Sequence, residues 1–279
     1  VFADVDEFAC LDPDSIEKLI GPRTRGVMFV GMGGNTGQLT RVSDLCRKYN
    51  LRLILDAAHM AGTRVGDTHV GNEADCSVFS FQAVKNLPTA DSGMICFHEE
   101  SHDRIVRMMS WLGIDKDTYS RSSSATGGTY KWHYDVKYLG LKANGNSIMA
   151  AIGIAQLPHL DSDNARRREI ADLYSLSLKD LSGISFIPSS TTCTSSQHLI
   201  QVLVLDGRRD ELVDHLTSRN IFPGVHYRIN TEYDMYRASF GNCPVAERMS
   251  NELLTLPNHL RLSDEDVLAV SAAIRDFFL

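Results

Sequence analysis

Apolar segments of strand length alternate with amphipathic segments of helix length along the first half of the chain. RGVMFV at residues 25–30 is a candidate buried strand, GQLTRVSDLCRKYN at 37–50 a candidate helix, and LRLILD at 51–56 a second strand. CSVFSF at 76–81 and GMICF at 93–97 continue the series, and a helix is expected near 99–110. Because strands joined by helices run parallel, this order predicts an α/β fold with a mainly parallel sheet.

The first predicted helix lies in DPDSIEKLIG, ahead of these strands. Asp12 is a candidate N-cap, Pro13 suits the first helical position, and Gly21 is a candidate C-terminal stop.

The pattern changes in the second half of the chain. Residues 113–145 are polar and rich in glycine and serine, which predicts a functional or interface loop. Helices are predicted in SIMAAIGIAQL (147–157) and DSDNARRREIADLYSLSLKDL (161–181). These helices are followed by four further predicted elements: a strand in HLIQVLVL, a helix in RRDELVDHLTSRN, a short strand in FPGVHY and a terminal helix in DEDVLAVSAAIRDFF. We therefore predict a large domain at 1–161 with its connecting helix and a small α+β domain at 162–279.

Charge and cysteine content narrow the class of protein. Lys and Arg number 28 against 35 Asp and Glu, a net charge of −7, so no field favours nucleic acid or an anionic membrane surface. The one basic run, Arg166 to Arg168, is interpreted as a solvated helix face, with an anion contact as the alternative. The six cysteines are scattered and show no zinc-site pattern, which predicts reduced thiols, a cytoplasmic location and no metal. No apolar stretch has the length of a membrane span.

Four polar side chains fall at or just past the ends of predicted strands. Asp56 closes LRLILD, His59 follows three residues later, Ser80 lies in CSVFSF, and Lys85 comes shortly after it. In a parallel α/β sheet, ligands bind beyond these strand ends. Pyridoxal phosphate needs such a set: an amine that forms a Schiff base with its aldehyde, a carboxylate that keeps the pyridine nitrogen protonated, a ring that stacks and a hydroxyl for the phosphate.

Each residue also has a simpler interpretation. Asp56 can cap a following helix, His59 can be a satisfied buried histidine, and Lys85 alone can be a surface lysine. Ser80 by itself indicates little. The four together in strand-end positions are far more specific than any one of them.

At these residues the chain resembles the DegT/StrS family of sugar aminotransferases, within the fold-type I pyridoxal phosphate enzymes. The family pattern stands here as LDAAHMAG, FSFQAVKNLPTADSG and AAIGIAQL, in the family's order, with further matches at GVHY and LPNHLRLSDEDV. The resemblance covers essentially the whole chain. It implies a fold-type I transferase with a mainly parallel large domain and a small C-terminal α+β domain.

The resemblance also implies roles for individual residues. Lys85 would be the catalytic Schiff-base lysine and the proton shuttle, Asp56 would pair with the pyridinium nitrogen, His59 would stack on the ring, and Ser80 would bind the phosphate. His226 and Tyr227 in GVHY would line the substrate side of the pocket, with a purely structural role as the alternative.

Family members are homodimers with shared active sites, and the resemblance implies the same here. The shared loop corresponds to LGLKANGNSIMAA, where Lys142 and Asn144 stand in place of the usual asparagine and arginine. The cross-subunit phosphate contact would fall to them, with Lys142 as a point charge. The implied reaction moves an amino group, with glutamate as donor, onto a keto sugar carried by a nucleotide.

The chain departs from the family pattern at other positions as well. Asp91 and Ser92 replace acidic and glycine positions in the loop after the lysine. The family's front segment, with its phosphate loop and stacking aromatic, is missing before VFADVDE, so we expect a sequence truncated at its N-terminus whose large domain is incomplete.

Two rival functions remain at this level. VMFVGMGGNTGQLTRV followed by a strand ending in Asp56 is compatible with a dinucleotide-binding oxidoreductase, although its glycines miss the G-x-G-x-x-G spacing. Those glycines can instead provide unusual backbone angles in a loop. A non-catalytic relative that serves as a sensor or assembly partner is the second rival, against which the pairing of Lys85 with Asp56 weighs.

Overall fold

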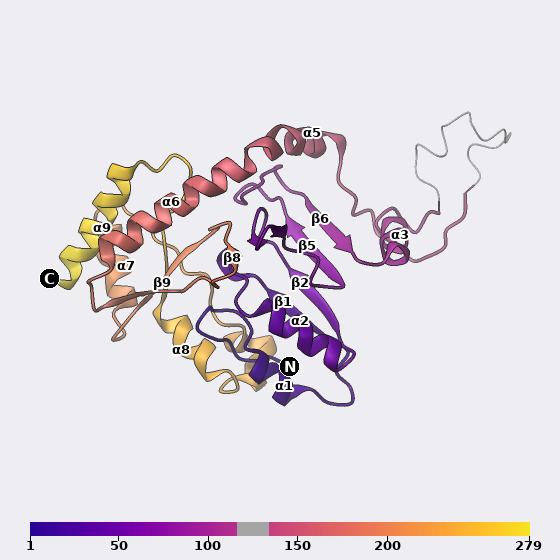
Figure 1. The fold of residues 1–279 in the computed structure, drawn as a ribbon, viewed down its shortest axis with the longest axis horizontal. Coiled ribbons are helices and arrows are strands. Elements are labelled where there is room, and N and C mark those ends of the chain that lie inside the picture. Colours follow the sequence, from indigo (N-terminus) through magenta and orange to yellow (C-terminus); the bar gives the residue numbers. More distant parts are fainter. Residues whose placement is uncertain (116–133) are drawn as a thin grey trace.

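The computed structural model describes residues 1–115 and 134–279. One sheet is formed by the N-terminal part of the chain and another by the C-terminal part, and helices pack around both (Figure 1). Helices α5 and α6 run along one side of the molecule and connect the two parts (Figure 1).

The first sheet confirms the predicted strands and their mainly parallel arrangement. Its order is β1-β2-β5-β6, in which β1, β2 and β5 are parallel and β6 pairs with β5 in the antiparallel sense. The strands are β1 (Gly26–Val30), β2 (Arg52–Asp56), β5 (Cys76–Ser80) and β6 (Gly93–Phe97). Asp56 pairs in register with Val30 on one side and Val78 on the other, so β1 and β2 end at the same level and β5 continues two residues further, to Ser80.

Alternation along these strands separates a buried face from an exposed one. Phe29 and Leu55 are fully buried at 0% exposure, and helix α2 (Leu39–Lys48) packs over this face with Leu39 and Val42. The intervening Met28 on the opposite face is 59% exposed. The apolar runs that predicted the strands therefore have one covered face and one exposed face.

Helix α1 (Pro13–Leu19) begins as predicted and ends directly before Gly21. The Asp12 side chain accepts a hydrogen bond from the Asp14 N–H, and Pro13 occupies the first turn. Ile20, in an extended conformation, is the C-terminal cap, and its N–H bonds to Glu17 O, so Gly21 is the first residue past the cap.

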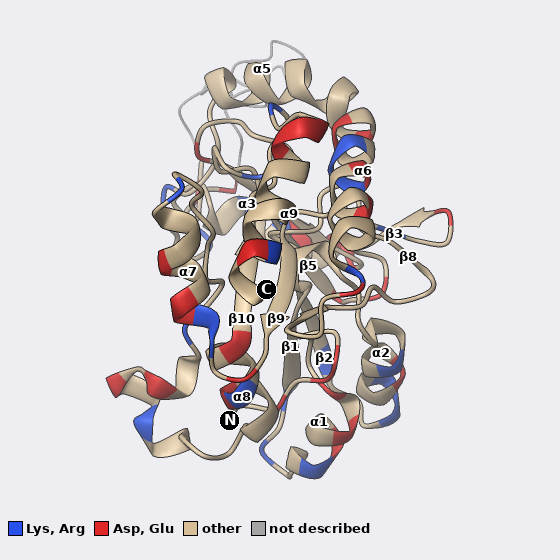
Figure 2. Cartoon of the chain, turned by 90° about the vertical axis from the view of Figure 1, so that its left-hand side faces the viewer, with Lys and Arg blue, Asp and Glu red and all other residues tan. Residues whose placement is uncertain are grey.

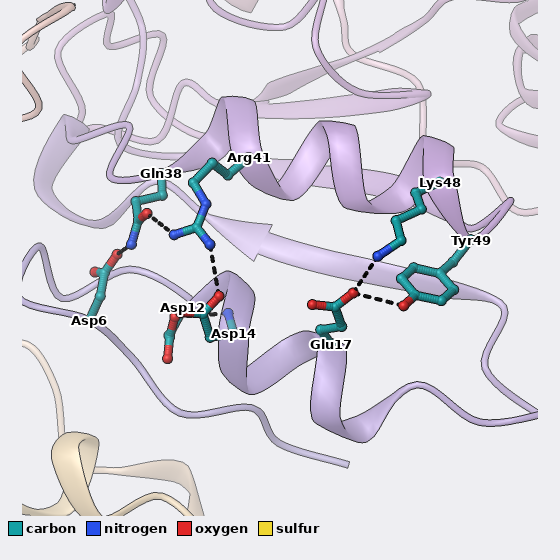
Figure 3. Close-up of polar contacts among 8 residues, drawn as sticks. All are labelled: Asp6, Asp12, Asp14, Glu17, Gln38, Arg41, Lys48 and Tyr49. Carbon is teal, nitrogen blue, oxygen red and sulfur yellow. Dashed lines mark hydrogen bonds and ion pairs between the residues drawn. The ribbon is translucent and has the colours of Figure 1, made fainter.

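Polar side chains join α1 to α2 across the surface (Figure 3). Arg41 Nη2 lies 2.7 Å from Asp14 Oδ1, and Glu17 Oε1 accepts from Lys48 Nζ and Tyr49 Oη at 2.7 Å each. Both ion pairs are exposed and add little stability by themselves.

Short strands tie the two parts of the chain together. The small sheet β4-β3-β8 is antiparallel, and β8 belongs to the C-terminal part although β3 and β4 belong to the N-terminal part. These strands are β3 (Arg64–Val65), β4 (Thr68–His69) and β8 (Cys193–Thr194). A second link joins the N-terminus to α8, where the Asp4 carboxylate accepts from the N–H groups of Val245 and Ala246.

Helices precede and follow the region outside the described residues. The loop predicted at 113–145 falls largely in it. The helices are α3 (Glu100–Met109), α5 (Ser147–Gln156) and α6 (Leu160–Leu178), with the 3-10 turn η2 (Leu157–His159) between the last two. The predicted boundary at 161/162 stays a prediction, since α5, η2 and α6 follow one another almost continuously.

The C-terminal part contains an antiparallel sheet in the order β10-β9-β7, with helices packed against it. Its strands are β7 (Ile184–Phe186), β9 (Ile200–Val204) and β10 (Leu253–Leu256). Its helices are α7 (Arg209–Thr217), η3 (Asn230–Glu232), η4 (Asp234–Ser239), α8 (Pro244–Glu252) and α9 (Asp264–Phe278). The strand expected at FPGVHY is reduced to a single bridge between Gly224 and Thr255.

A separate apolar core holds this part together. Tyr174 of α6, Leu212 of α7, Leu254 of β10 and Val267 of α9 are all fully buried at 0% exposure. Every residue of β9 is buried, in agreement with its mainly apolar sequence IQVLV, in which Gln201 is the one polar residue.

The basic run of α6 is not the solvated face that was expected. Figure 2 shows basic and acidic residues interspersed along α6. Arg167 is only 9% exposed, and its Nη1 donates to Asn258 O at 3.1 Å. Arg168 donates to Ser195 O and Arg166 pairs with Asp264, so all three residues bind protein groups. Among the helices of the described residues, none is long and apolar enough to cross a membrane.

Candidate active site

The site is built at the carboxyl ends of the parallel strands. Asp56 is the last residue of β2 and Ser80 the last of β5, and the turn after β5 carries Lys85, whose N–H donates to Gln82 O at 2.9 Å. Asp56 Oδ1 accepts from the Ala58 N–H at 3.0 Å within a turn. The helix that Asp56 was thought to cap is therefore a turn, which leaves Asp56 at the open end of the sheet.

Lys85 lies at the centre of a group of titratable side chains. Its side chain is partly buried, and burial lowers the pKa of its amine, an effect that the nearby carboxylate of Asp56 opposes. Burial, followed by the charge of Lys85, also lowers the pKa of His226. Burial, followed by the charge of Asp56, raises the pKa of Tyr227. The structure therefore brings Asp56, Lys85, His226 and Tyr227 within electrostatic reach of one another.

His59 is buried at 7% exposure, and both its ring nitrogens have partners. Nδ1 accepts from the Gly33 N–H at 3.3 Å, so the proton of the neutral ring lies on Nε2, 3.4 Å from Tyr227 Oη. Burial, with added effects from Lys85 and His226, lowers the pKa of His59 to about 4. His59 is thus a neutral, hydrogen-bonded ring beside the amine.

The glycine-rich turn after β1 is filled by protein groups. Gly33 and Gly34 have φ angles of 64° and 95°, and a Cβ on Gly34 would lie 2.2 Å from Ser196 Oγ. The carbonyl of Gly34 accepts from the hydroxyls of Thr63 and Ser195. The glycines therefore serve the backbone angles and close packing of this turn, as the simpler interpretation predicted.

The other predicted residues lie around this group in different ways. Ser80 Oγ accepts from the Gln82 N–H at 3.4 Å, next to the turn that carries Lys85. His226 Nδ1 is 2.9 Å from Thr255 Oγ1. Lys142 and Asn144 lie on the loop beside α3, where Lys142 Nζ is 5.4 Å from the centre of the Trp111 ring. Asn144 Nδ2 donates to the carbonyl of the next residue, Gly145, at 3.1 Å. The predicted role of Lys142 and Asn144 across a subunit interface stays a prediction.

Sequence reasoning missed His198, Asn86, Asn164 and Ser196. The His198 ring lies 4.4 Å from that of His59, its Nδ1 is 2.7 Å from Asn86 Oδ1, and the Ser196 hydroxyl donates to His59 O at 2.7 Å. The residues involved are more than 75 positions apart in the chain. The only signal was weak: a histidine directly before an apolar strand and an asparagine after the lysine.

A pocket of about 950 Å³ opens beside the loop that follows Lys85. Its lining includes Thr89 and Ser92 from that loop, Phe79 and Met94 from the sheet, and residues of α5. It adjoins the group around Lys85 without being centred on it, so the chemistry is assigned from the side chains and not from this pocket.

The buried histidines give a testable pH dependence. Burial, then the charges of His59 and Lys85, lowers the pKa of His198 to about 2. Because the unfolded chain takes up a proton on this ring near pH 6.5 and the folded chain does not, stability is full above that pH and falls as the pH decreases. Urea unfolding of the wild type and of His198→Asn at about pH 7 and about pH 5 should show an extra loss of about 2 kcal/mol in the wild type. An equal loss in both proteins would contradict a neutral buried His198.

Comparisons with known proteins show which proteins the whole chain resembles. The family model described as the DegT/DnrJ/EryC1/StrS aminotransferase family matches residues 1–275. A dTDP-4-dehydro-2,3,6-trideoxy-D-glucose 4-aminotransferase of Saccharopolyspora spinosa is 31% identical over 274 residues, which cover 97% of this chain and 70% of that protein.

Solved structures share the fold. The aminotransferase TlmJ of Streptoalloteichus hindustanus has a TM-score of 0.89 and 31% identity, with 99% of this chain and 72% of that chain covered. The Streptococcus pneumoniae protein Spr1654, solved in its PLP form, has a TM-score of 0.87 and 25% identity, with 100% and 76% covered. The fold is that of pyridoxal phosphate-dependent aminotransferases, as predicted.

Proposed function

The chain belongs to the DegT/DnrJ/EryC1/StrS aminotransferase family, whose members are pyridoxal phosphate-dependent sugar aminotransferases, and on this premise we propose its substrates and its site residues. The proposed reaction moves the amino group of glutamate onto the keto carbon of a nucleotide-linked sugar. Family membership removes the basis for the dinucleotide-dependent oxidoreductase, and the retained Lys85 and Asp56 favour an enzyme over a non-catalytic relative.

The observation that carries the proposal is the partly buried Lys85 amine beside Asp56 at the strand ends. Pyridoxal phosphate, when bound, supplies an aldehyde that an amine can attack and a ring that withdraws electrons. Burial lowers the pKa of Lys85, so a larger fraction of its amine is unprotonated and able to act as a nucleophile and a base. Asp56 is proposed to hold a proton on the ring nitrogen.

The neighbouring residues are proposed to orient and enclose the reactants. The neutral ring of His59 offers a flat surface whose position is held by Gly33 and His198. Ser80 provides a hydroxyl for a phosphate at the end of β5. Tyr227 and His226 stand on the side of the C-terminal part, where the sugar is proposed to bind.

A homodimer with shared sites is proposed from the loop before α5. Leu139 is 96% exposed and Leu141 75%, and both stand just before the loop's predicted phosphate ligand Lys142. Large exposed apolar side chains flanking a functional residue are typical of a subunit interface. A cytoplasmic location is proposed as well, because all six cysteines are free thiols.

Transfer of labelled nitrogen tests the proposed substrates. We expect the purified protein, supplied with pyridoxal phosphate and [15N]glutamate, to add one labelled nitrogen to a dTDP-4-keto sugar and to release 2-oxoglutarate. Mass spectrometry of the nucleotide sugar measures the transfer, with the same protein lacking glutamate as control. Labelling of a keto cyclitol but of no nucleotide sugar would contradict the nucleotide-linked substrate while leaving the donor intact.

A further inference from the structure

Asn86, the residue after Lys85, forms hydrogen bonds with two other buried polar side chains, and we call the three the Asn86 cluster: Asn86, Asn164 and His198. Their exposed fractions are 6%, 1% and 9%. Asn86 follows Lys85, Asn164 lies in α6, and His198 precedes β9. Burial of such groups costs free energy unless each is hydrogen-bonded, and apolar side chains would fill the space without that cost. The cluster is therefore better explained by what it holds in place than by fold stability.

The Asn86 side chain forms hydrogen bonds with three partners. Its Nδ2 donates to Asn164 Oδ1 at 2.6 Å and to Ser196 O at 2.8 Å. Because both of its N–H groups are used in this way, its Oδ1 accepts the third bond, from His198 Nδ1 at 2.7 Å. Any displacement of the main chain at Asn86 would break these hydrogen bonds.

The partners of Asn86 are themselves fixed. Asn164 sits in the 19-residue helix α6, and its Nδ2 donates to Ala61 O at 2.9 Å. The Ser196 hydroxyl donates to His59 O at 2.7 Å. The cluster thus holds the turn of Lys85 and the turn of His59 against the same helix.

A further layer supports His198. Gln197, the residue before His198, accepts a hydrogen bond at its main-chain carbonyl from Asn258 Nδ2 at 2.6 Å. The main-chain carbonyl of Asn258 in turn accepts from the buried Arg167 at 3.1 Å. The His198 ring rests on that of His59 at 4.4 Å. His198 is therefore held on both its main chain and its ring, which makes it a rigid donor to Asn86.

We propose that the Asn86 cluster positions Lys85 for attachment to the cofactor, with His198 as a positioning residue that acts through Asn86. The inference rests on the role of Lys85 in the proposed function. A lysine amine ends a flexible four-carbon chain, so the fixed main chain beside it limits where the amine can be. A misplacement of about 1 Å at a reacting group can slow a reaction by about a hundredfold.

Two substitutions at His198 separate this role from simple packing. His198→Asn keeps a donor, because the asparagine Nδ2 lies about where the imidazole Nδ1 stood, whereas His198→Leu keeps volume and loses the donor. The measurement is the rate at which added pyridoxal phosphate becomes bonded to Lys85, followed by visible absorption and by borohydride quenching with peptide mapping. We expect His198→Leu to slow the rate by about tenfold and His198→Asn to stay within about twofold of the wild type. The circular dichroism of the bound cofactor should change in the leucine variant alone.

The control is His215→Leu in α7, which removes a hydrogen bond to Ala273 O in the apolar core and should leave the rate per folded molecule unchanged. Rates are divided by the folded fraction from thermal unfolding. A leucine variant at His198 as fast as the wild type would overturn the inference, as would an asparagine variant as slow as the leucine one. A wild-type chain in which borohydride fixes no cofactor on Lys85 would overturn the role of Lys85 and this inference together, so the two failures are distinguishable.

Discussion

Replacement of Lys85 by alanine is expected to lower kcat by about 10⁴-fold, because the chain loses both its nucleophilic amine and its proton carrier. Lys85→Arg should lose as much, since a guanidinium keeps the charge but stays protonated and does not bond to an aldehyde. Single-turnover and steady-state assays of amino transfer measure the effect, and borohydride should fix cofactor on neither variant.

The fold should survive both changes at Lys85. The side chain is only partly buried, and the hydrogen bond that it contributes to its turn comes from the main chain. The matched control is Lys179→Ala at the exposed end of α6, which should keep full activity. If Lys85→Ala retained more than about a hundredth of the wild-type kcat, the assignment of the nucleophile would be wrong.

Replacement of Asp56 by asparagine is expected to lower kcat by about 10³-fold. The amide oxygen can still accept from the Ala58 N–H, so the turn is preserved, but a neutral amide does not hold a proton on the ring nitrogen. Steady-state kinetics measure the loss, and cofactor attachment to Lys85 should persist because the amine is intact.

The control for Asp56→Asn is Asp91→Asn on the exposed loop after the lysine. This residue is one of the departures from the family pattern, and its substitution should change kcat by less than about twofold. An Asp56→Asn variant within about tenfold of the wild type would show that another group protonates the ring.

Much of the fold and the centre of the site could be predicted because the signals are local. Apolar runs of strand length mark β1, β2 and β5, Asp56 closes β2, and His59 and Lys85 follow β2 and β5 within a few positions. Their meeting follows from the parallel order of the strands. The N-terminal cap at Asp12 depends only on the neighbouring Pro13 and Asp14, so it could be predicted in the same way.

The remaining features depend on contacts between distant segments. Arg167, in a run of three arginines, was expected to be solvated. In the structure it donates to the carbonyl of Asn258, which is 91 positions away. His198 and Asn86 meet across 112 positions, and neither carries a pattern that points to the other.

The hydrogen bond from Asn86 to Ser196 closes a loop of 110 residues, and the pairing of β8 with β3 closes one of similar length. Contacts of such sequence separation bear a large loop-closure cost before they contribute stability, so they form late in folding. A chain emerging from the ribosome can complete its first sheet, with Asp56 and Lys85 at its strand ends, before the C-terminal part is made. Docking of that part adds His198, His226 and Tyr227 to the surroundings of the amine, so stable capture of the cofactor is expected to mark the end of folding.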